Sequence, residues 1–195
     1  MSLDVTTIIR IDNYLEIFDL INNEPPSALE IYQESHKQLT IGNNELAQKL
    51  YKLNYILYNS SIPPKTKIGK NTIFSYGAIG IILHEGAVIG DRCTIGPHVV
   101  IGGTSKGVPV IGDDCFFSVG CKVLGNINIG KCSIIGANAL VIKDVPPYSV
   151  VAGSPAVVIN TITPKNFHRY QGHYWCKNKP ESIKGFIRYH WGVDY

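Results

Sequence analysis

Two histidines, His84 and His98, are the residues in the middle of the chain best suited to acid–base chemistry. Each lies close to a short segment that interrupts an otherwise regular repeat. An imidazole takes up a proton near neutral pH, and an attacking hydroxyl has to lose one. We therefore expect His84 to be a general base, with His98 as the second candidate and no catalytic role for either as the alternative. No carboxylate or cysteine pattern completes a ligand set around them, so no metal is expected.

A six-residue repeat organises the middle of the chain and predicts the elements that hold these histidines. Hydrophobic residues recur at every sixth position, in three blocks: Ile62, Ile68 and Phe74; Leu83, Ile89, Ile95 and Ile101; Ile111, Phe117, Val123, Ile129, Ile135 and Val141. We expect each hexapeptide to form one short face of a three-sided coil, with the hydrophobic side chain inside. Glycine often follows, and we expect it at corners that need a permissive backbone. The pattern predicts a parallel β-helix of a little over four coils.

The position four residues after each of these hydrophobic residues is mostly small, which suits a crowded inward corner. Its occupants are Thr66, Thr72, Ala78, Ala87, Cys93, Val99, Cys115, Cys121, Ser133 and Ala139, with Ile127 as the main exception. Three of the five cysteines lie in this set, and we interpret them as small core residues rather than nucleophiles. Since the total is odd and no Cys-x-x-Cys pair occurs, the sequence indicates reduced thiols and a cytoplasmic protein.

The repeat is interrupted twice. The step before Leu83 has nine residues instead of six and contains Tyr76-Gly77-Ala78-Ile79-Gly80. The step before Ile111 has ten residues and contains Gly103-Thr104-Ser105-Lys106-Gly107. Extra residues in a solenoid bulge out as loops, and such loops often carry function. Two insertions close in sequence, next to both histidines, therefore indicate a site. His84 also takes a corner position where most repeats have glycine, so its side chain should point outward.

The segment before the repeat, residues 1–60, is expected to be helical. Ile11, Leu15 and Phe18 share one face of a first helix, which Pro25-Pro26 end. Ser27, with Glu30 at the capping-box position, and Asn43 or Asn44 are expected to cap two further helices. We interpret this segment as a packing or oligomerisation element.

The segment after the repeat, residues 160–195, is an irregular tail rich in aromatic residues and histidine. We expect it to pack on the coil or on a partner subunit, with a role in acceptor binding as the alternative, since aromatic faces suit sugar rings and acyl chains. The predicted organisation is therefore a helical segment over 1–60, a β-helix over 61–159 and a tail over 160–195.

Composition excludes several classes of protein. The net charge, 18 − 15 = +3, is too weak to argue for nucleic-acid binding. Hydrophobic residues make up 45% and charged residues 17%, which excludes general disorder. No apolar run approaches the roughly 18 residues of a membrane span. The stretch from Met1 to Arg10 does not resemble a signal peptide.

Four motifs resemble the serine acetyltransferases of the hexapeptide-repeat acyltransferase family. They are Ile62-Pro63-Pro64-Lys65-Thr66-Lys67-Ile68-Gly69, Val123-Leu124-Gly125-Asn126-Ile127, Lys143-Asp144-Val145-Pro146-Pro147 and Val151-Ala152-Gly153-Ser154-Pro155-Ala156. The resemblance implies a mainly β fold, a left-handed parallel β-helix, and acetyl transfer from acetyl-CoA to a serine hydroxyl. It also implies a homotrimer with a histidine base between neighbouring subunits. The handedness rests on the resemblance alone, because parallel crossovers are normally right-handed.

The chain departs from that family at the residues that carry its chemistry. Tyr76 and its neighbours replace the His-Ala-Thr-Gly motif, so His84 would supply the base, and Glu85 matches a family glutamate. The loop lacks an Arg-His pair implicated in holding the amino acid, and only Lys106 offers a cation there. The expected catalytic residues are therefore His84 and Glu85, and the substrate-binding candidates are Tyr76, His98 and Lys106. Alignment carries the acetyl-CoA positions to Gly103, Val119 and Ala137. A lysine that usually contacts CoA is Val157 here, and Lys143 or Lys131 could substitute for it.

Three functions stay open at this point. The first is acetyl-CoA-dependent O-acetyl transfer to serine. The second is the same chemistry on a sugar hydroxyl in surface-polysaccharide assembly, which the lost amino-acid contacts and the aromatic tail favour. The third is a non-catalytic β-helix scaffold. Since the chain ends in Asp194-Tyr195 rather than isoleucine, we expect no complex with cysteine synthase.

Overall fold

Two helices precede the coil in the computed structural model, which describes residues 25–176 and 179–193. Helix α3 (Ala28–Thr40) begins at Ser27, and the predicted capping box with Glu30 is present. Helix α4 (Asn44–Tyr58) is capped by Asn43, whose side chain accepts a hydrogen bond from the Leu46 N–H. Both predicted caps are confirmed, since they satisfy N–H groups that helix ends leave without partners. The helix predicted through Ile11, Leu15 and Phe18 lies outside the described residues.

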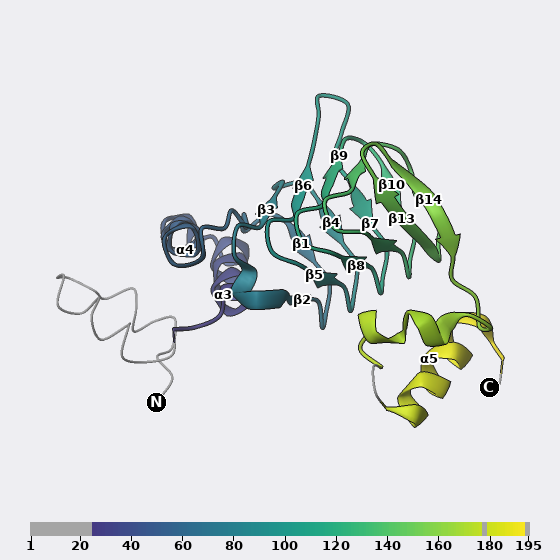
Figure 1. Cartoon of the computed structure of the whole chain (residues 1–195). Helices are drawn as coiled ribbons and strands as arrows, with labels where there is room; N and C mark the ends of the chain where they lie inside the picture. Colours follow the sequence, from purple (N-terminus) through teal and green to yellow (C-terminus); the bar gives the residue numbers. More distant parts are fainter. Residues whose placement is uncertain (1–24, 177–178, 194–195) are drawn as a thin grey trace.

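The coil that follows is built of three parallel faces, named here sheets I, II and III in the order in which the chain visits them (Figure 1). Sheet I contains β1 (Lys67–Ile68), β4 (Val88–Ile89), β7 (Val110–Ile111) and β10 (Asn128–Ile129). Sheet II contains β2 (Ile73–Phe74), β5 (Thr94–Ile95), β8 (Phe116–Phe117), β11 (Ile134–Ile135), β13 (Ser149–Gly153) and the antiparallel β14 (Ala156–Thr161). Sheet III contains β3 (Ile82–Leu83), β6 (Val100–Gly102), β9 (Lys122–Leu124) and β12 (Leu140–Val141). The predicted β-helix is therefore present.

The inward positions of the repeat form one continuous core. Eleven of the thirteen repeated hydrophobic residues are buried, and the other two, Ile68 and Phe74, are partly buried in the first coil. The small positions are all buried, and Ile127 is too. Burial raises the pKa of Cys121 to about 12 and holds that of Cys115 well above its usual value. These thiols stay protonated at neutral pH, so the interpretation as core residues is confirmed.

The repeated glycines serve close packing more than chain reversal, which corrects our expectation for the corners. Between sheets I and II, a Cβ on Gly90 would lie 2.7 Å from the Asp113 nitrogen, and one on Gly112 would lie 2.7 Å from the Lys131 nitrogen. The left-handed backbone at this corner belongs to non-glycine residues: Asn71, Arg92, Asp114, Cys132 and Tyr148. Glycine is needed because successive coils leave no room for a side chain there.

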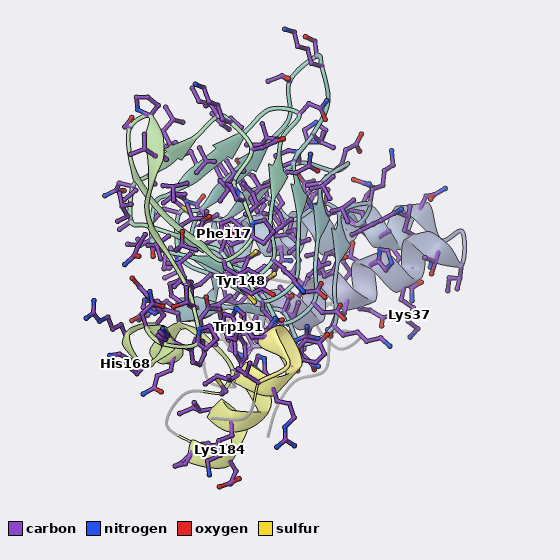
Figure 2. The ribbon with its side chains drawn as sticks, turned by 90° about the vertical axis from the view of Figure 1, so that its right-hand side faces the viewer. Lys37, Phe117, Tyr148, His168, Lys184 and Trp191 are labelled. Carbon is purple, nitrogen blue, oxygen red and sulfur yellow. The ribbon has the colours of Figure 1, made fainter. Side chains whose placement is uncertain are left out.

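The tail packs on the outer side of sheet II. Of the two expected placements, on the coil or on a partner subunit, the structure shows the first. Strand β14 leads into two short 3₁₀ turns, η2 (Phe167–Arg169) and η3 (Gln171–His173), and then into α5 (Pro180–Trp191). Phe167, Tyr174 and Phe186 form a buried cluster against Ile134 and Cys132 of the coil. In Figure 2, Tyr148 and Trp191 lie where this tail meets the coil, and their rings are 5.2 Å apart.

Helices α3 and α4 cover the opposite end of the coil from β13 and β14 (Figure 1). Ala28 and Tyr32 of α3 join the coil core, and the Tyr32 hydroxyl donates to the Thr66 carbonyl at 2.6 Å. The Asn54 amide of α4 donates to the Ala28 carbonyl at 3.0 Å, which ties the two helices together. Within the described residues, no helix is long and apolar enough to cross a membrane.

Candidate active site

His84 lies at the corner between sheets III and I, directly after β3. Its backbone is fixed, because its N–H donates to the Ile101 carbonyl at 2.8 Å and its carbonyl accepts from the Thr66 hydroxyl at 3.1 Å. The side chain is exposed, as the sequence predicts for a bulky residue at this position. A Cβ on Gly103 would lie 3.1 Å from its Nε2 atom. The ring therefore lies against the first residue of the second insertion, one coil further along.

The hydrogen bond at the other ring nitrogen sets the resting state of His84. The Gly86 N–H donates to Nδ1 at 3.0 Å. A backbone N–H needs a lone pair as acceptor, so Nδ1 carries no proton and the proton of the neutral ring lies on Nε2. The resting ring therefore presents an N–H group toward Gly103. It takes up a proton at Nε2 only after its own proton has moved to Nδ1 and the bond with Gly86 has been released.

The second insertion forms a tight turn that projects from the coil between β6 and β7 (Figure 1). Thr104 and Gly107 exchange backbone hydrogen bonds of 2.8 and 3.1 Å across it. Lys106 is exposed in this turn. At its base, a Cβ on Gly103 would also lie 2.7 Å from Cγ1 of Val108. A larger residue at position 103 would therefore force Val108 or the imidazole to shift.

The first insertion and His98 occupy a different corner, between sheets II and III. The insertion forms a 3₁₀ turn, η1 (Ser75–Ala78), in which Tyr76 is left-handed and 82% exposed. The His98 N–H donates to the Ile79 carbonyl at 2.9 Å, and a Cβ on Gly80 would collide with its ring. Each insertion therefore lies beside one histidine. The two insertions, each with its histidine, therefore lie at opposite edges of sheet III.

The expected acetyl-CoA positions divide in the same way. Gly103 and Lys143 follow β6 and β12, at the corner that His84 occupies. Val119 and Ala137 follow β8 and β11, at the corner that His98 occupies. All four precede or follow a strand of sheet III, so both corners border this one face.

A groove beside His84 was not foreseen from the sequence. It has a volume of about 340 Å³ and lies between α4 and the first coil. Its lining is Leu39, Gln48, Tyr51, Pro63, Pro64, Lys65, Leu83, His84 and Glu85. Glu85, a catalytic candidate from the sequence, forms an ion pair with Lys65 at 3.3 Å. The sequence carries a signal for one side of this groove, since Pro64-Lys65 and His84-Glu85 lie three repeats apart and therefore at the same corner. Only the fold shows that α4 forms the other side.

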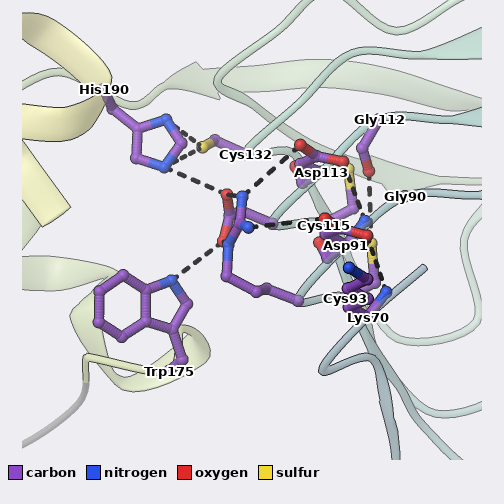
Figure 3. A network of polar contacts seen from close by, with 12 residues as sticks. Lys70, Gly90, Asp91, Cys93, Gly112, Asp113, Cys115, Cys132, Trp175 and His190 are labelled. Atoms are coloured by element: carbon purple, nitrogen blue, oxygen red, sulfur yellow. Dashed lines mark hydrogen bonds and ion pairs between the residues drawn. The ribbon is translucent and has the colours of Figure 1, made fainter.

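A second polar cluster holds the tail on the coil (Figure 3). Arg92 donates to both carboxylate oxygens of Asp114, at 2.9 and 2.8 Å, and Trp175 and His190 contact them at 3.0 and 3.2 Å. Burial opposes ionisation of Asp114, but hydrogen bonds from His190 and Arg92 outweigh it, and its pKa is lowered. Cys132 lies 3.2 Å from His190. Burial raises the pKa of its thiol, so this grouping offers no ready thiolate.

Comparisons with known proteins point to one family. Serine acetyltransferase 4 of Arabidopsis thaliana is 38% identical over 139 residues, which cover 69% of this chain and 39% of that protein. A serine acetyltransferase of Buchnera aphidicola subsp. Schizaphis graminum is 32% identical, over 74% of this chain and 57% of its own length. No family model matches the chain.

Solved structures agree with these relatives. A serine acetyltransferase in complex with CoA superposes with a TM-score of 0.63 and 33% identity, covering 68% of this chain and 55% of that one. Another in complex with cysteine gives a TM-score of 0.68 and 30% identity, over 76% and 59%. The chain spans less than two thirds of the length of each of these proteins. With its coil of parallel strands, the chain is a left-handed β-helix protein of the hexapeptide-repeat, serine acetyltransferase-like type.

Proposed function

We propose that the chain is an acetyl-CoA-dependent O-acetyltransferase that acts on the hydroxyl of serine. The observation that carries this proposal is the contact between His84 and Gly103, which is one of the three positions that alignment assigns to acetyl-CoA. The relatives are called serine acetyltransferases, and one similar structure was solved with CoA. Gly103 fits this role because a Cβ there would fill the space between His84 and Val108.

In the proposed reaction, the serine hydroxyl oxygen attacks the thioester carbonyl while the imidazole of His84 takes the hydroxyl proton. A bond forms between that oxygen and the acetyl carbon, and the bond from carbon to sulfur breaks. The proton then passes to the CoA thiolate, which leaves as a thiol. Backbone N–H groups at the corner stabilise the negative oxygen of the intermediate.

Proton uptake at Nε2 requires that His84 give up its bond with Gly86. One such hydrogen bond contributes about 0.5–1.5 kcal/mol. A general base accelerates a reaction by roughly 10²–10⁴-fold, which equals about 3–5 kcal/mol of barrier. Because the gain exceeds the cost and the ring is exposed, the resting arrangement is compatible with the base role.

We also propose that the protein is a homotrimer in which two copies complete each site. His84, Gly103 and Lys106 border one edge of sheet III, and Tyr76 and His98 border the other. One copy would present the first edge to the second edge of its neighbour, so that acetyl-CoA lies between Gly103 and Lys143 of one copy and Val119 and Ala137 of the next. The tail packs on sheet II and, within the described residues, adds no strand to sheet III.

A thiol-release assay tests the activity. Purified protein is supplied with acetyl-CoA and serine, then with sugars, and without an acceptor as the control. We expect release of CoA thiol that depends on serine. Release with sugars alone would indicate the polysaccharide function, and release with neither class of acceptor would favour a scaffold.

A further inference from the structure

We infer that the groove beside His84 recognises the charged backbone of a free α-amino acid, with Lys65 holding the carboxylate and Glu85 the ammonium group. The inference rests on the proposed function and names the residues that select the acceptor. It replaces the expectation that Lys106, in the projecting turn, is the cation for this purpose.

The groove has the chemistry that a small zwitterion needs. Its volume, about 340 Å³, is large enough to admit a molecule of that size. Lys65 and Glu85 carry opposite charges on one side of it, with 3.3 Å between Nζ and Oε2. Leu39, Pro63 and Leu83 add apolar side chains to its lining.

The direct ion pair is easily exchanged for a ligand. The side chains of Lys65 and Glu85 are 63% and 57% exposed. Exposed pairs of this kind contribute little to stability, so opening the pair costs little. A zwitterion placed between them gives each side chain a new charged partner. The two charges therefore remain satisfied in the free and in the occupied groove.

The placement of His84 explains why the amino acid should carry a hydroxyl. His84 lines the same groove and precedes Glu85 directly in the chain. Its ring also lies against Gly103, on the side where we place the thioester. We therefore place the side-chain hydroxyl of an amino acid that binds Glu85 next to the imidazole. The hydroxyl of the bound amino acid then faces the thioester placed near Gly103, with the imidazole beside both.

Two charge-removing variants test the inference. We expect Lys65→Gln and Glu85→Gln to raise the KM for serine roughly 10- to 100-fold each, as loss of a charge-assisted contact predicts. The KM for acetyl-CoA should stay within about twofold. Glu181→Gln and Lys184→Gln remove an exposed ion pair of 3.6 Å on α5 and serve as the matched control. The exchange Lys65→Glu with Glu85→Lys restores an ion pair, so it rescues a structural role but not recognition.

Modified ligands make the test specific. Serine methyl ester has no anionic carboxylate, so its KM should be raised with the wild type and raised no further with Lys65→Gln. N-Acetylserine has no ammonium group and should behave in the same way with Glu85→Gln. If the modified ligand and the substitution each raise KM and their effects add, the assignment of Lys65 and Glu85 to the two charges is overturned. Wild-type protein that releases no thiol with serine refutes the proposed function itself. In that case, calorimetric titration with serine still tests the inference. Weaker serine binding by Lys65→Gln than by the wild type would support it, and unchanged binding would overturn it.

Discussion

The imidazole of His84 and the backbone of Gly103 face each other across two successive coils, and a Cβ at position 103 would lie 3.1 Å from the ring. This contact joins a corner of the first full coil to the insertion that interrupts the second. It places the candidate base, the predicted acetyl-CoA position and the groove next to α4 in one row along a single edge of the β-helix.

Adding a methyl group at this contact should disturb the site without unfolding the coil. We expect Gly103→Ala to lower kcat/KM for acetyl-CoA at least 10-fold, because the new Cβ would lie 2.7 Å from Val108 and 3.1 Å from His84. The double variant Gly103→Ala with Val108→Ala removes the tighter of the two contacts and should recover part of the loss. Steady-state kinetics measures both, with the thermal midpoint as a control for folding. Wild-type kinetics in Gly103→Ala would contradict the placement of acetyl-CoA here.

The buried carboxylate of Asp114 should stabilise the attachment of the tail. Asp114→Asn leaves Arg92 without its buried partner and should lower the free energy of unfolding by about 3 kcal/mol at pH 7. Asp113→Asn is the matched control, since its carboxylate is 45% exposed and 3.5 Å from Arg92, and it should cost under about 1 kcal/mol. Urea unfolding followed by tryptophan fluorescence measures both. Equal losses of stability in the two variants would show that the buried carboxylate of Asp114 contributes no more than the exposed one of Asp113.

The effect of Asp114 should also depend on pH. Its pKa in the folded protein is below the usual 3.8, so the folded state binds fewer protons there than the unfolded state. The stabilisation is therefore complete above the unfolded pKa and is lost as the pH falls through the folded pKa. We expect the difference between wild type and Asp114→Asn to be full at pH 7 and to shrink below about pH 4. A constant difference from pH 7 to pH 2 would contradict the lowered pKa.

Two inactive variants should restore activity when they share a trimer. His84→Ala removes the base at one edge of sheet III, and Val119→Arg places a bulky charge at the other edge, where acetyl-CoA is expected. If two copies build each site, some sites in mixed trimers contain neither change. Co-expressed variants carrying different affinity tags, purified in two steps, should then acetylate serine. Two separately inactive variants that stay inactive together, or a monomer in light scattering at micromolar concentration, would argue against a shared site.

The coil could be predicted from the sequence because the repeat constrains each residue locally. A side chain such as Phe117 or Ile135 is inside because of its position in the six-residue period, whatever lies far away in the chain. The caps at Ser27 and Asn43 were also foreseeable, since each depends on residues three positions ahead.

The site was harder to predict because its geometry depends on contacts between segments far apart in the chain. His84 could be singled out, since a histidine in place of a corner glycine is a local anomaly. Its neighbours Gln48 and Tyr51 could not, because only the packing of α4 on the first coil brings them to the groove. The separation of the two insertions could not be predicted either, because it depends on the corner at which each one leaves the coil.

The most direct test of the account compares variants of the two histidines in the serine-dependent thiol-release assay. We expect His84→Ala to lower kcat/KM roughly 10²–10⁴-fold, as loss of a general base does, and His98→Ala to cost much less. His84→Gln keeps an amide N–H donor but has no basic nitrogen, so it should be as impaired as His84→Ala. Equal losses at His84 and His98, or a His84→Gln variant with nearly wild-type kcat, in correctly folded protein, would contradict the assignment of His84 as the base.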